Sequence, residues 1–213
     1  MLHTKISPET AKRLTANLYD KIAERYTTTF STDPDRDIVD LFLSFLPENS
    51  RILDIGCGPG IIAEYMHKKG YQVEGIDISR KMIELAKKRA PKCKFRLLDM
   101  RDLDYSHNSF DGIVALYSII HVPKSIIFEV FTKFSKILKK GGYLLIAVQE
   151  GDGEVLLRDP LAPEEKVFLS LFEEEKLLRV LREFGFSVIH ISKRDPVVGE
   201  FPYPHLRIIA KKE

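Results

Sequence analysis

The chain has 213 residues, 44% of them hydrophobic and 30% charged, which suits one globular domain with a sizeable core and is short for two. Its 33 Lys and Arg residues against 31 Asp and Glu give a net charge of +2, which excludes the strong positive field of a protein built around a polyanion. Two cysteines, Cys57 and Cys93, exclude a disulfide framework, and they lack the spacing of a metal site.

The first predicted element is an N-terminal amphipathic helix. Ser7-Pro8-Glu9 offers a cap, a proline suited to the first turn and an early acid, and apolar residues follow every fourth position from Leu14 to Tyr26. The start of the chain contains no apolar signal core, and no run approaches the roughly 18 apolar residues of a membrane span. These features predict a cytoplasmic protein with no membrane partner. Asp33-Pro34 predicts the start of a second helix, which Pro47 closes.

Short apolar runs then alternate with helical stretches. Such alternation predicts βαβ units and a doubly wound parallel sheet, whose strands are rich in Ile, Leu and Val because both faces are covered. Lysine clusters at 68–69, 87–89 and 139–140 fall where helices are expected to end. The expected strands are RILDI (51–55), YQVEGID (71–77), CKFRLLDM (93–100), FDGIVALYS (110–118) and GYLLIAVQE (142–150).

The last third departs from this alternation. Ser170 and Glu173 have the spacing of a capping box, which predicts a helix continuing through residues 177–185. Two strands follow in succession, at 186–193 and 205–212. The proline-rich segment between them is too short for a crossover helix, so we expect these strands to pair antiparallel.

The stretch LDIGCGPG (53–60) is the strongest functional signal. It follows a predicted strand and opens a helix, a setting in which alternating glycines let a ligand approach the backbone. A dinucleotide fingerprint fails here, because Ile61 stands where a third small residue is needed, and Pro59 has no N–H for a phosphate. Asp54 would also repel an anion. The loop therefore favours a ligand with an ammonium group, such as S-adenosylmethionine.

Two further acids lie at predicted strand ends. Asp77 ends the second strand and can accept hydrogen bonds from both ribose hydroxyls. Asp99 ends the third strand and offers an acceptor for an adenine amino group, while Met100 beside it supplies soft apolar area. Alone, Asp99 could be an ordinary capping residue.

Residues 53–60, Asp77, Asp99 and the stretch FDGIVALYSIIHVP (110–123) together resemble the successive motifs of the class I S-adenosylmethionine-dependent methyltransferases. The resemblance implies an α/β, Rossmann-like, doubly wound sheet of seven strands in the order 3-2-1-4-5-7-6, the seventh antiparallel. It also implies one methyltransferase domain over residues 1–213. This domain would comprise an N-terminal helical cap (1–47), a cofactor-binding core (48–150) and a substrate lid with the last helix and strand pair (151–213).

The resemblance also implies roles for single residues. Asp77 matches the ribose acid and Ile78 flanks adenine. Leu116, near the end of the fourth strand, matches a backbone position close to the cofactor. Tyr19 and Tyr26, in YDKIAERY, match a segment that folds over the cofactor, although a packed aromatic stripe is an equal alternative. Cys57 either lines the cofactor or is a small buried residue. The implied cofactor-binding set is Asp54, Gly56, Cys57, Gly58, Gly60, Asp77, Ile78, Asp99, Met100, Leu116, Tyr19 and Tyr26.

The expected activity is methyl transfer from S-adenosylmethionine to an O, N, S or C nucleophile of a small molecule. His121, just past the fourth strand, is the catalytic candidate, either as a general base or as a residue that hydrogen-bonds its loop. Gln149 and Glu150 end the fifth strand, and Arg158, Tyr203 and His205 lie in the expected lids as further substrate contacts.

Three alternatives stay open. One is a methyltransferase acting on protein or RNA, although the chain lacks the basic, aromatic stripe of a nucleic-acid binder. Another is a noncatalytic module that binds S-adenosylmethionine or a partner. The third is a nicotinamide-dependent oxidoreductase, which Pro59 and Ile61 disfavour. The sequence does not determine the oligomeric state.

Overall fold

The computed structural model describes residues 6–30 and 34–213, and their centre is a seven-stranded sheet. Its strands lie in the order β3-β2-β1-β4-β5-β9-β8. Because β6 and β7 belong to a separate sheet, β8 and β9 are the predicted sixth and seventh strands, and the predicted fold is confirmed. The strands are β1 (Arg51–Ile55), β2 (Gln72–Asp77), β3 (Lys94–Leu97), β4 (Phe110–Leu116), β5 (Leu138–Gln149), β8 (Phe186–Arg194) and β9 (His205–Lys212).

The first five of these strands are parallel and β9 is antiparallel to both of its neighbours. Parallel strands joined by helices must be covered on both faces, which is why their sequences are apolar throughout. Two groups of fully buried side chains lie against the sheet, one around Phe131 and Phe134 and the other around Phe42 and Met66.

Within residues 6–30 and 34–213, six α-helices flank the sheet: α1 (Pro8–Thr29), α2 (Arg36–Ser44), α3 (Ile61–Lys68), α4 (Arg80–Arg89), α5 (Ile127–Ile137) and α6 (Glu174–Glu183). Three 3₁₀ turns, η1 (Met100–Asp102), η2 (Ile119–His121) and η3 (Lys124–Ile126), follow the ends of β3 and β4. Ser7 caps α1 as predicted, since its hydroxyl accepts from the backbone N–H of Thr10 at 3.2 Å.

Several predicted boundaries were wrong. Ser170 does not open a helix: it ends a strand, its hydroxyl donates to the carbonyl of Val122 at 2.7 Å, and α6 begins four residues later without a side-chain cap. The pair 139–140 lies in β5 instead of at a helix end, because Lys139 extends to Asp111 on neighbouring β4 at 2.7 Å. Asp33 lies outside the described residues, and α2 starts at Arg36.

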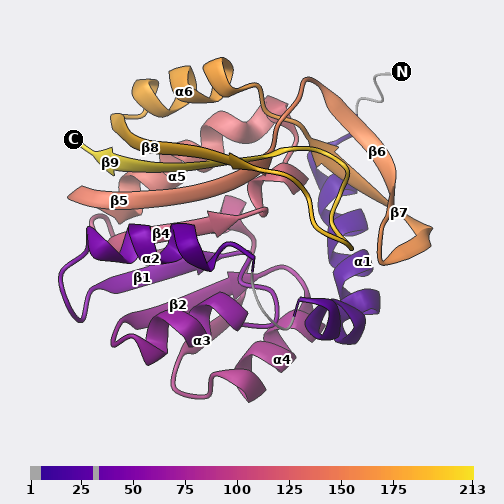
Figure 1. Cartoon of the computed structure of the whole chain (residues 1–213), viewed down its shortest axis with the longest axis horizontal. Helices are drawn as coiled ribbons and strands as arrows, with labels where there is room; N and C mark the ends of the chain where they lie inside the picture. The colour runs from indigo at the N-terminus through magenta and orange to yellow at the C-terminus, as the bar shows by residue number, and fades with distance from the viewer. Residues whose placement is uncertain (1–5, 31–33) are drawn as a thin grey trace.

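A hairpin that the sequence did not predict follows β5. Strands β6 (Glu154–Asp159) and β7 (Ala162–Ser170) pair antiparallel as a separate two-stranded sheet, within the segment expected only to form a lid. The hairpin packs against α1, and both lie at the end of the molecule opposite the C-terminus (Figure 1).

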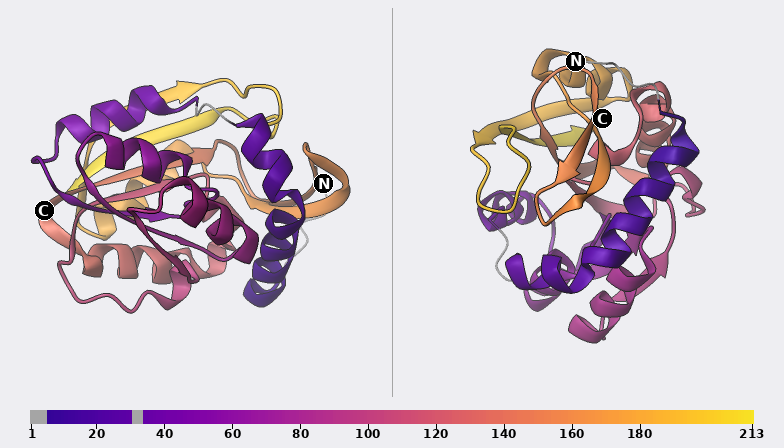
Figure 2. Two further views of the ribbon diagram at one scale, coloured as in Figure 1. Left: turned by 90° about the horizontal axis from the view of Figure 1, so that it is seen from below. Right: turned by 90° about the vertical axis from the view of Figure 1, so that its right-hand side faces the viewer.

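Three segments gather at this end of the sheet, where the parallel strands finish. Figure 2 shows α1 crossing it diagonally, with the β6–β7 hairpin and the loop between β8 and β9 beside it. These segments come from the two ends of the sequence, yet they surround the same edge of the sheet. This edge holds the candidate site.

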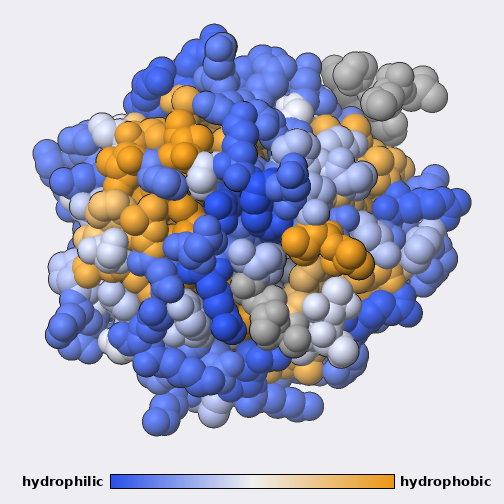
Figure 3. Space-filling view, viewed as in Figure 1, coloured by the Kyte–Doolittle hydropathy of each residue, from blue (hydrophilic) through white to orange (hydrophobic). Residues whose placement is uncertain are grey.

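The outer face of edge strand β8 is partly apolar. Ile189 and Ile191 of this strand are exposed. Figure 3 shows apolar area, in orange, on the face of the molecule that is also viewed in Figure 1. No described helix is long and apolar enough to cross a membrane.

Candidate functional site

The glycine loop forms the floor of the site and depends on backbone conformations that favour glycine. Gly56, Gly58 and Gly60 have φ values of 73°, 52° and 78°. A Cβ at Gly56 would lie 2.3 Å from the Cβ of Ser118, in the turn that follows β4. A Cβ at Gly58 would have the Tyr26 ring as its nearest neighbour, at 4.0 Å. The loop is therefore tightly packed on one side and open on the other.

Asp77, at the end of β2, supports this loop and faces the open side. Its carboxylate accepts the backbone N–H of Gly58 at 2.9 Å and that of Ser79 at 2.8 Å. Burial raises the pKa of Asp77 to about 6, and these hydrogen bonds only partly oppose it. The carboxylate retains acceptor positions for further donors.

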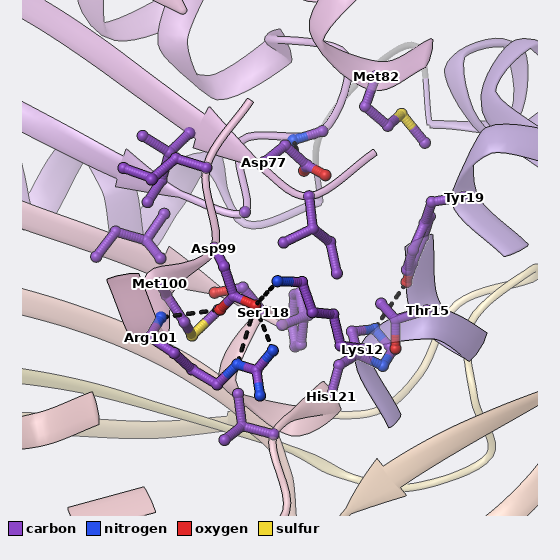
Figure 4. Close-up of a pocket in the computed structure, with 18 of the residues that line it drawn as sticks. Lys12, Thr15, Tyr19, Asp77, Met82, Asp99, Met100, Arg101, Ser118 and His121 are labelled. Carbon is purple, nitrogen blue, oxygen red and sulfur yellow. Dashed lines mark hydrogen bonds and ion pairs between the residues drawn. The ribbon is translucent and has the colours of Figure 1, made fainter. Parts of the chain in front are cut away.

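Asp99, between β3 and η1, is held as an anion by two cations. It accepts from Arg101 Nε at 2.9 Å, and Lys12 Nζ of α1 lies 3.0 Å from the same carboxylate (Figure 4). Burial opposes ionisation of Asp99, but these hydrogen bonds outweigh it and the pKa is lowered. Asp99 thereby also links α1 to the edge of the sheet.

A first cavity lies between α1 and the ends of β1 to β4 (Figure 4). Carboxylates line it at one side and apolar side chains form most of the remaining wall. Its lining includes Lys12, Thr15, Tyr19, Tyr26, Gly56, Gly58, Asp77, Ile78, Met82, Leu98, Asp99, Met100, Arg101, Leu116, Tyr117, Ser118 and His121.

A second cavity adjoins the first. Tyr19, Tyr26 and Tyr117, together with the glycine loop and Leu116, line both cavities, so the two form one continuous cleft. Residues just before α2, from the β6–β7 hairpin and from the loop before β9 complete the second one. Its lining includes Phe30, Asp35, Asp54, Cys57, Pro59, Gln149, Asp159, Leu161, Glu200, Phe201 and His205.

Tyr19 and His121 meet at the edge of the first cavity. The Tyr19 hydroxyl is 2.9 Å from His121 Nε2, and His121 Nδ1 is 3.1 Å from the carbonyl oxygen of Phe168. The carbonyl can only accept, so Nδ1 carries the proton and Nε2 accepts from Tyr19. Burial lowers the pKa of His121 to about 4, which keeps the ring neutral at pH 7.

The structure brings most of the predicted cofactor-binding residues together around this cleft. Gly60 is the exception, because it lines neither cavity. A Cβ added at Gly60 would lie 3.1 Å from Ala86 of α4. Cys57 lines the second cavity, and burial, with the nearby carboxylates of Asp54 and Asp77, raises its thiol pKa. Such a thiol is a poor nucleophile at neutral pH.

The predicted substrate contacts divide into two groups. Gln149 and His205 line the second cavity, whereas Glu150, Arg158 and Tyr203 do not. Glu150 instead pairs with Lys193 at 2.6 Å, and Arg158 donates to the carbonyl of Pro163 at 2.6 Å.

The sequence analysis missed several lining residues. Lys12 and Thr15 lie on the face of α1 that turns toward the sheet, and Asp159 lies at the turn of the unexpected hairpin. Tyr117 and Ser118 directly follow Leu116 in the motif at 110–123, and this position in the sequence could have identified them as lining residues. Tyr117 has φ 52°, a conformation uncommon for a non-glycine residue and frequent at functional sites.

Comparison with known proteins places this geometry in a family. The methyltransferase domain family matches residues 26–191. The demethylmenaquinone methyltransferase of Thermotoga maritima is 31% identical over 144 residues, covering 63% of this chain and 61% of that protein. The chain spans about half the length of the curated relatives it matches.

Solved structures share the fold. A SAM-dependent methyltransferase from Methanosarcina mazei is 25% identical with a TM-score of 0.74, covering 81% of this chain and 96% of that one. The Burkholderia thailandensis 1,6-didemethyltoxoflavin-N1-methyltransferase, solved with 1,6-didemethyltoxoflavin and S-adenosylhomocysteine, has a TM-score of 0.79 at 18% identity. The match covers 100% of this chain and 93% of that one.

Proposed function

Since the chain belongs to the class I S-adenosylmethionine-dependent methyltransferase family, we propose that it transfers a methyl group from S-adenosylmethionine to a small molecule. The proposal covers residues 1–213 as one methyltransferase domain. The observation that carries it is the pair of carboxylates, Asp77 and Asp99, at the ends of adjacent strands in a cavity that continues past the glycine loop.

The residues of the first cavity fit the cofactor chemically. Asp77 can accept from ribose hydroxyls, and the apolar side chains of Ile78, Met82 and Met100 offer surface for a purine ring. The open space above Gly58 allows a ligand to contact the backbone. Asp54 and Leu116, at the ends of β1 and β4, would hold the amino-acid end of the cofactor.

In the proposed mechanism the protein contributes mainly position. S-adenosylmethionine, when bound, supplies an electrophilic methyl group, and an O, N, S or C nucleophile would attack it in line. Aligning two bound reactants can lower a barrier by about 7–11 kcal/mol, whereas a general base contributes about 10²- to 10⁴-fold in rate. The cleft formed by the two joined cavities offers space for both reactants, with the amino-acid end of the cofactor reaching Asp54 in the second cavity.

For His121 we propose a positioning role. Both ring nitrogens are engaged, one with Tyr19 and the other with Phe168, and the ring holds α1 over the first cavity. A general base would need Nε2 free to take a proton, so that role requires Tyr19 to move away.

A small-molecule acceptor is supported by the second cavity, a hollow lined by several segments, and by the relative that is named for demethylmenaquinone. A protein or RNA acceptor would need an open, extended surface next to the site. A noncatalytic binding module remains the alternative to an enzyme.

The test is cofactor binding followed by turnover. Calorimetry is expected to detect S-adenosylhomocysteine but not NAD, and labelled S-adenosylmethionine is expected to transfer its methyl group to a small acceptor. Cofactor binding without transfer across a broad panel would support the noncatalytic module. Absence of S-adenosylhomocysteine binding would refute the proposal altogether.

A further inference from the structure

The second cavity contains a pair of polar side chains, Gln149 and His205, with three buried polar atoms that no other described residue hydrogen-bonds. Gln149 and His205 stand directly opposite each other in the antiparallel pairing of β5 and β9. Opposed residues of such a pair project from the same face of the sheet. Both residues line the second cavity, so this polar pair forms one patch on its wall.

The polar pair is buried without internal hydrogen bonds. Gln149 is 3% exposed and His205 is 1% exposed. Among the described residues, Gln149 Oε1 and both ring nitrogens of His205 have no hydrogen-bond partner. The carboxylate of Glu200 lies 3.7 Å from His205 Nε2, beyond hydrogen-bond distance. Buried polar atoms without partners destabilise a fold, so their presence at a cavity wall indicates a ligand that satisfies them.

The wall around the polar pair is aromatic. Tyr26, Phe30, Tyr117 and Phe201 all line this cavity. The Tyr117 ring lies 4.7 Å from the His205 ring, and its hydroxyl accepts from Arg194 at 3.0 Å, which holds the ring in place. Aromatic walls offer flat apolar area and favour planar ligands.

The charge of the lining argues against an anionic ligand. The described residues that line the second cavity include four carboxylates, Asp35, Asp54, Asp159 and Glu200, and no lysine or arginine. Arg194 pairs with Asp35 and Glu200 at 2.9 and 2.6 Å, and Arg207 lies 3.4 Å from Asp35, so arginines behind the lining balance two of the four carboxylates. Burial, with Arg194 nearby, lowers the pKa of His205, so its ring is neutral at pH 7.

From these observations we propose that the second cavity binds an uncharged planar ring compound bearing a hydroxyl or ring N–H, which hydrogen-bonds to the polar pair of Gln149 and His205. Compounds of this shape with a carboxylate or phosphate are rejected by the acidic lining. That such a ring is the methyl acceptor rests on the proposed function, but its binding does not.

The experiment uses ligand-observed NMR and calorimetry on the whole chain, with and without S-adenosylhomocysteine. The probes form a fragment library in which each neutral ring compound is paired with its carboxylated analogue. Catechol is paired with 3,4-dihydroxybenzoate, for example, and benzimidazole with benzimidazole-5-carboxylate. Neutral members of the library are expected to bind at least about tenfold more tightly than their carboxylated analogues.

Variants then locate the binding. Gln149→Leu and His205→Phe are expected to weaken ring binding about tenfold while the affinity for S-adenosylhomocysteine stays unchanged. Ser192→Ala is the matched control, because Ser192 also has a buried hydroxyl without a partner but lines neither cavity. His205→Asn keeps a polar group and replaces His205→Phe if the latter fails to fold.

The outcomes separate the two proposals. Equal binding of carboxylated analogues, unchanged binding in the polar-pair variants, or no binding by any neutral probe would overturn the inference. Ring binding that depends on the polar pair in a protein that does not bind S-adenosylhomocysteine would support the inference and refute the proposed function.

Discussion

Gly56 is the residue at which the loop and the turn after β4 come closest. Its φ of 73° and the 2.3 Å separation between an added Cβ and Ser118 each disfavour any side chain. Gly141 has a similar φ of 76°, but an added Cβ there has no atom within 4 Å. Comparing the two positions separates backbone strain from the steric clash.

We predict that Gly56→Ala lowers the free energy of unfolding by about 2 kcal/mol or more and abolishes binding of S-adenosylhomocysteine, because Ser118 and the loop must move apart. Denaturant unfolding and calorimetry measure the two effects. The control Gly141→Ala keeps the strain without the clash, and is expected to lower stability by about 1 kcal/mol and leave binding intact. Equal effects of both substitutions would show that the close approach is unimportant.

Asp77 predicts a pH dependence of cofactor binding. Its pKa is raised to about 6, so the carboxylate becomes protonated as the pH falls through 6 and accepts hydrogen bonds less well. Affinity for S-adenosylhomocysteine should therefore weaken between pH 7 and pH 5, as followed by calorimetry. Asp77→Asn should bind more weakly at pH 7 and lose this dependence. A flat profile in the native protein would contradict the assigned role.

At the scale of elements, α1 is held over the cleft by polar contacts with several segments. Tyr19 bonds to His121, Lys12 pairs with Asp99, and Asp20 accepts from the Ser79 hydroxyl at 2.6 Å, while the hairpin strand β7 packs along the helix. Leu18 and Ile22 on the inner side of the helix are buried in the core. The helix therefore forms one wall of the first cavity.

We predict that Tyr19→Phe accelerates amide hydrogen exchange across residues 8–29 and lowers stability by about 1 kcal/mol, because His121 Nε2 loses its donor. Hydrogen exchange followed by mass spectrometry measures this. Tyr65→Phe is the control: it removes a hydroxyl that bonds to exposed Asp40 at 2.7 Å, away from α1. Unchanged exchange in α1 would mean that Tyr19 does not anchor the helix.

The buried His121 predicts how stability responds to acid. Its pKa is lowered from 6.5 to about 4, so the unfolded chain binds the proton more readily, and stability decreases as the pH falls from 6.5 toward 4. The resulting loss in the free energy of unfolding reaches about 3 kcal/mol when the pH is below both pKa values of His121, that of the unfolded chain and that of the folded protein. The stability difference between the native protein and His121→Gln should shrink over this pH range. A difference that is independent of pH would exclude the neutral buried ring.

At the scale of the whole molecule, the cleft lies between the sheet and segments from both ends of the chain. A ligand that fills it should therefore stabilise the entire fold. At a concentration 100 times its dissociation constant, a ligand adds about 2.7 kcal/mol, equivalent to a rise in Tm of roughly 5–10 °C for a chain of this size. We predict such a rise with S-adenosylhomocysteine and none with NAD. The reverse ranking would point to a nicotinamide-binding protein.

The β6–β7 hairpin shows where sequence reasoning was insufficient. Its strands carry charged residues and one proline, Pro163, and their pairing with each other and the packing of β7 on α1 and η2 make them an ordered element. The capping-box spacing at Ser170 was overridden for the same reason, since this residue bonds to Val122 within the tertiary structure. Local patterns failed where contacts between distant segments supplied the stabilisation.

The sequence by itself determined the order of strands and helices, the glycine loop and the acids at strand ends. Those features follow from local periodicity and from the rule that parallel strands finish at one edge of a sheet. Only the tertiary structure decided that Tyr19 meets His121, that Lys12 pairs with Asp99, and that Gln149 opposes His205 in a cavity. Each of these pairs joins segments far apart in the chain, and no local pattern specifies their distance or burial.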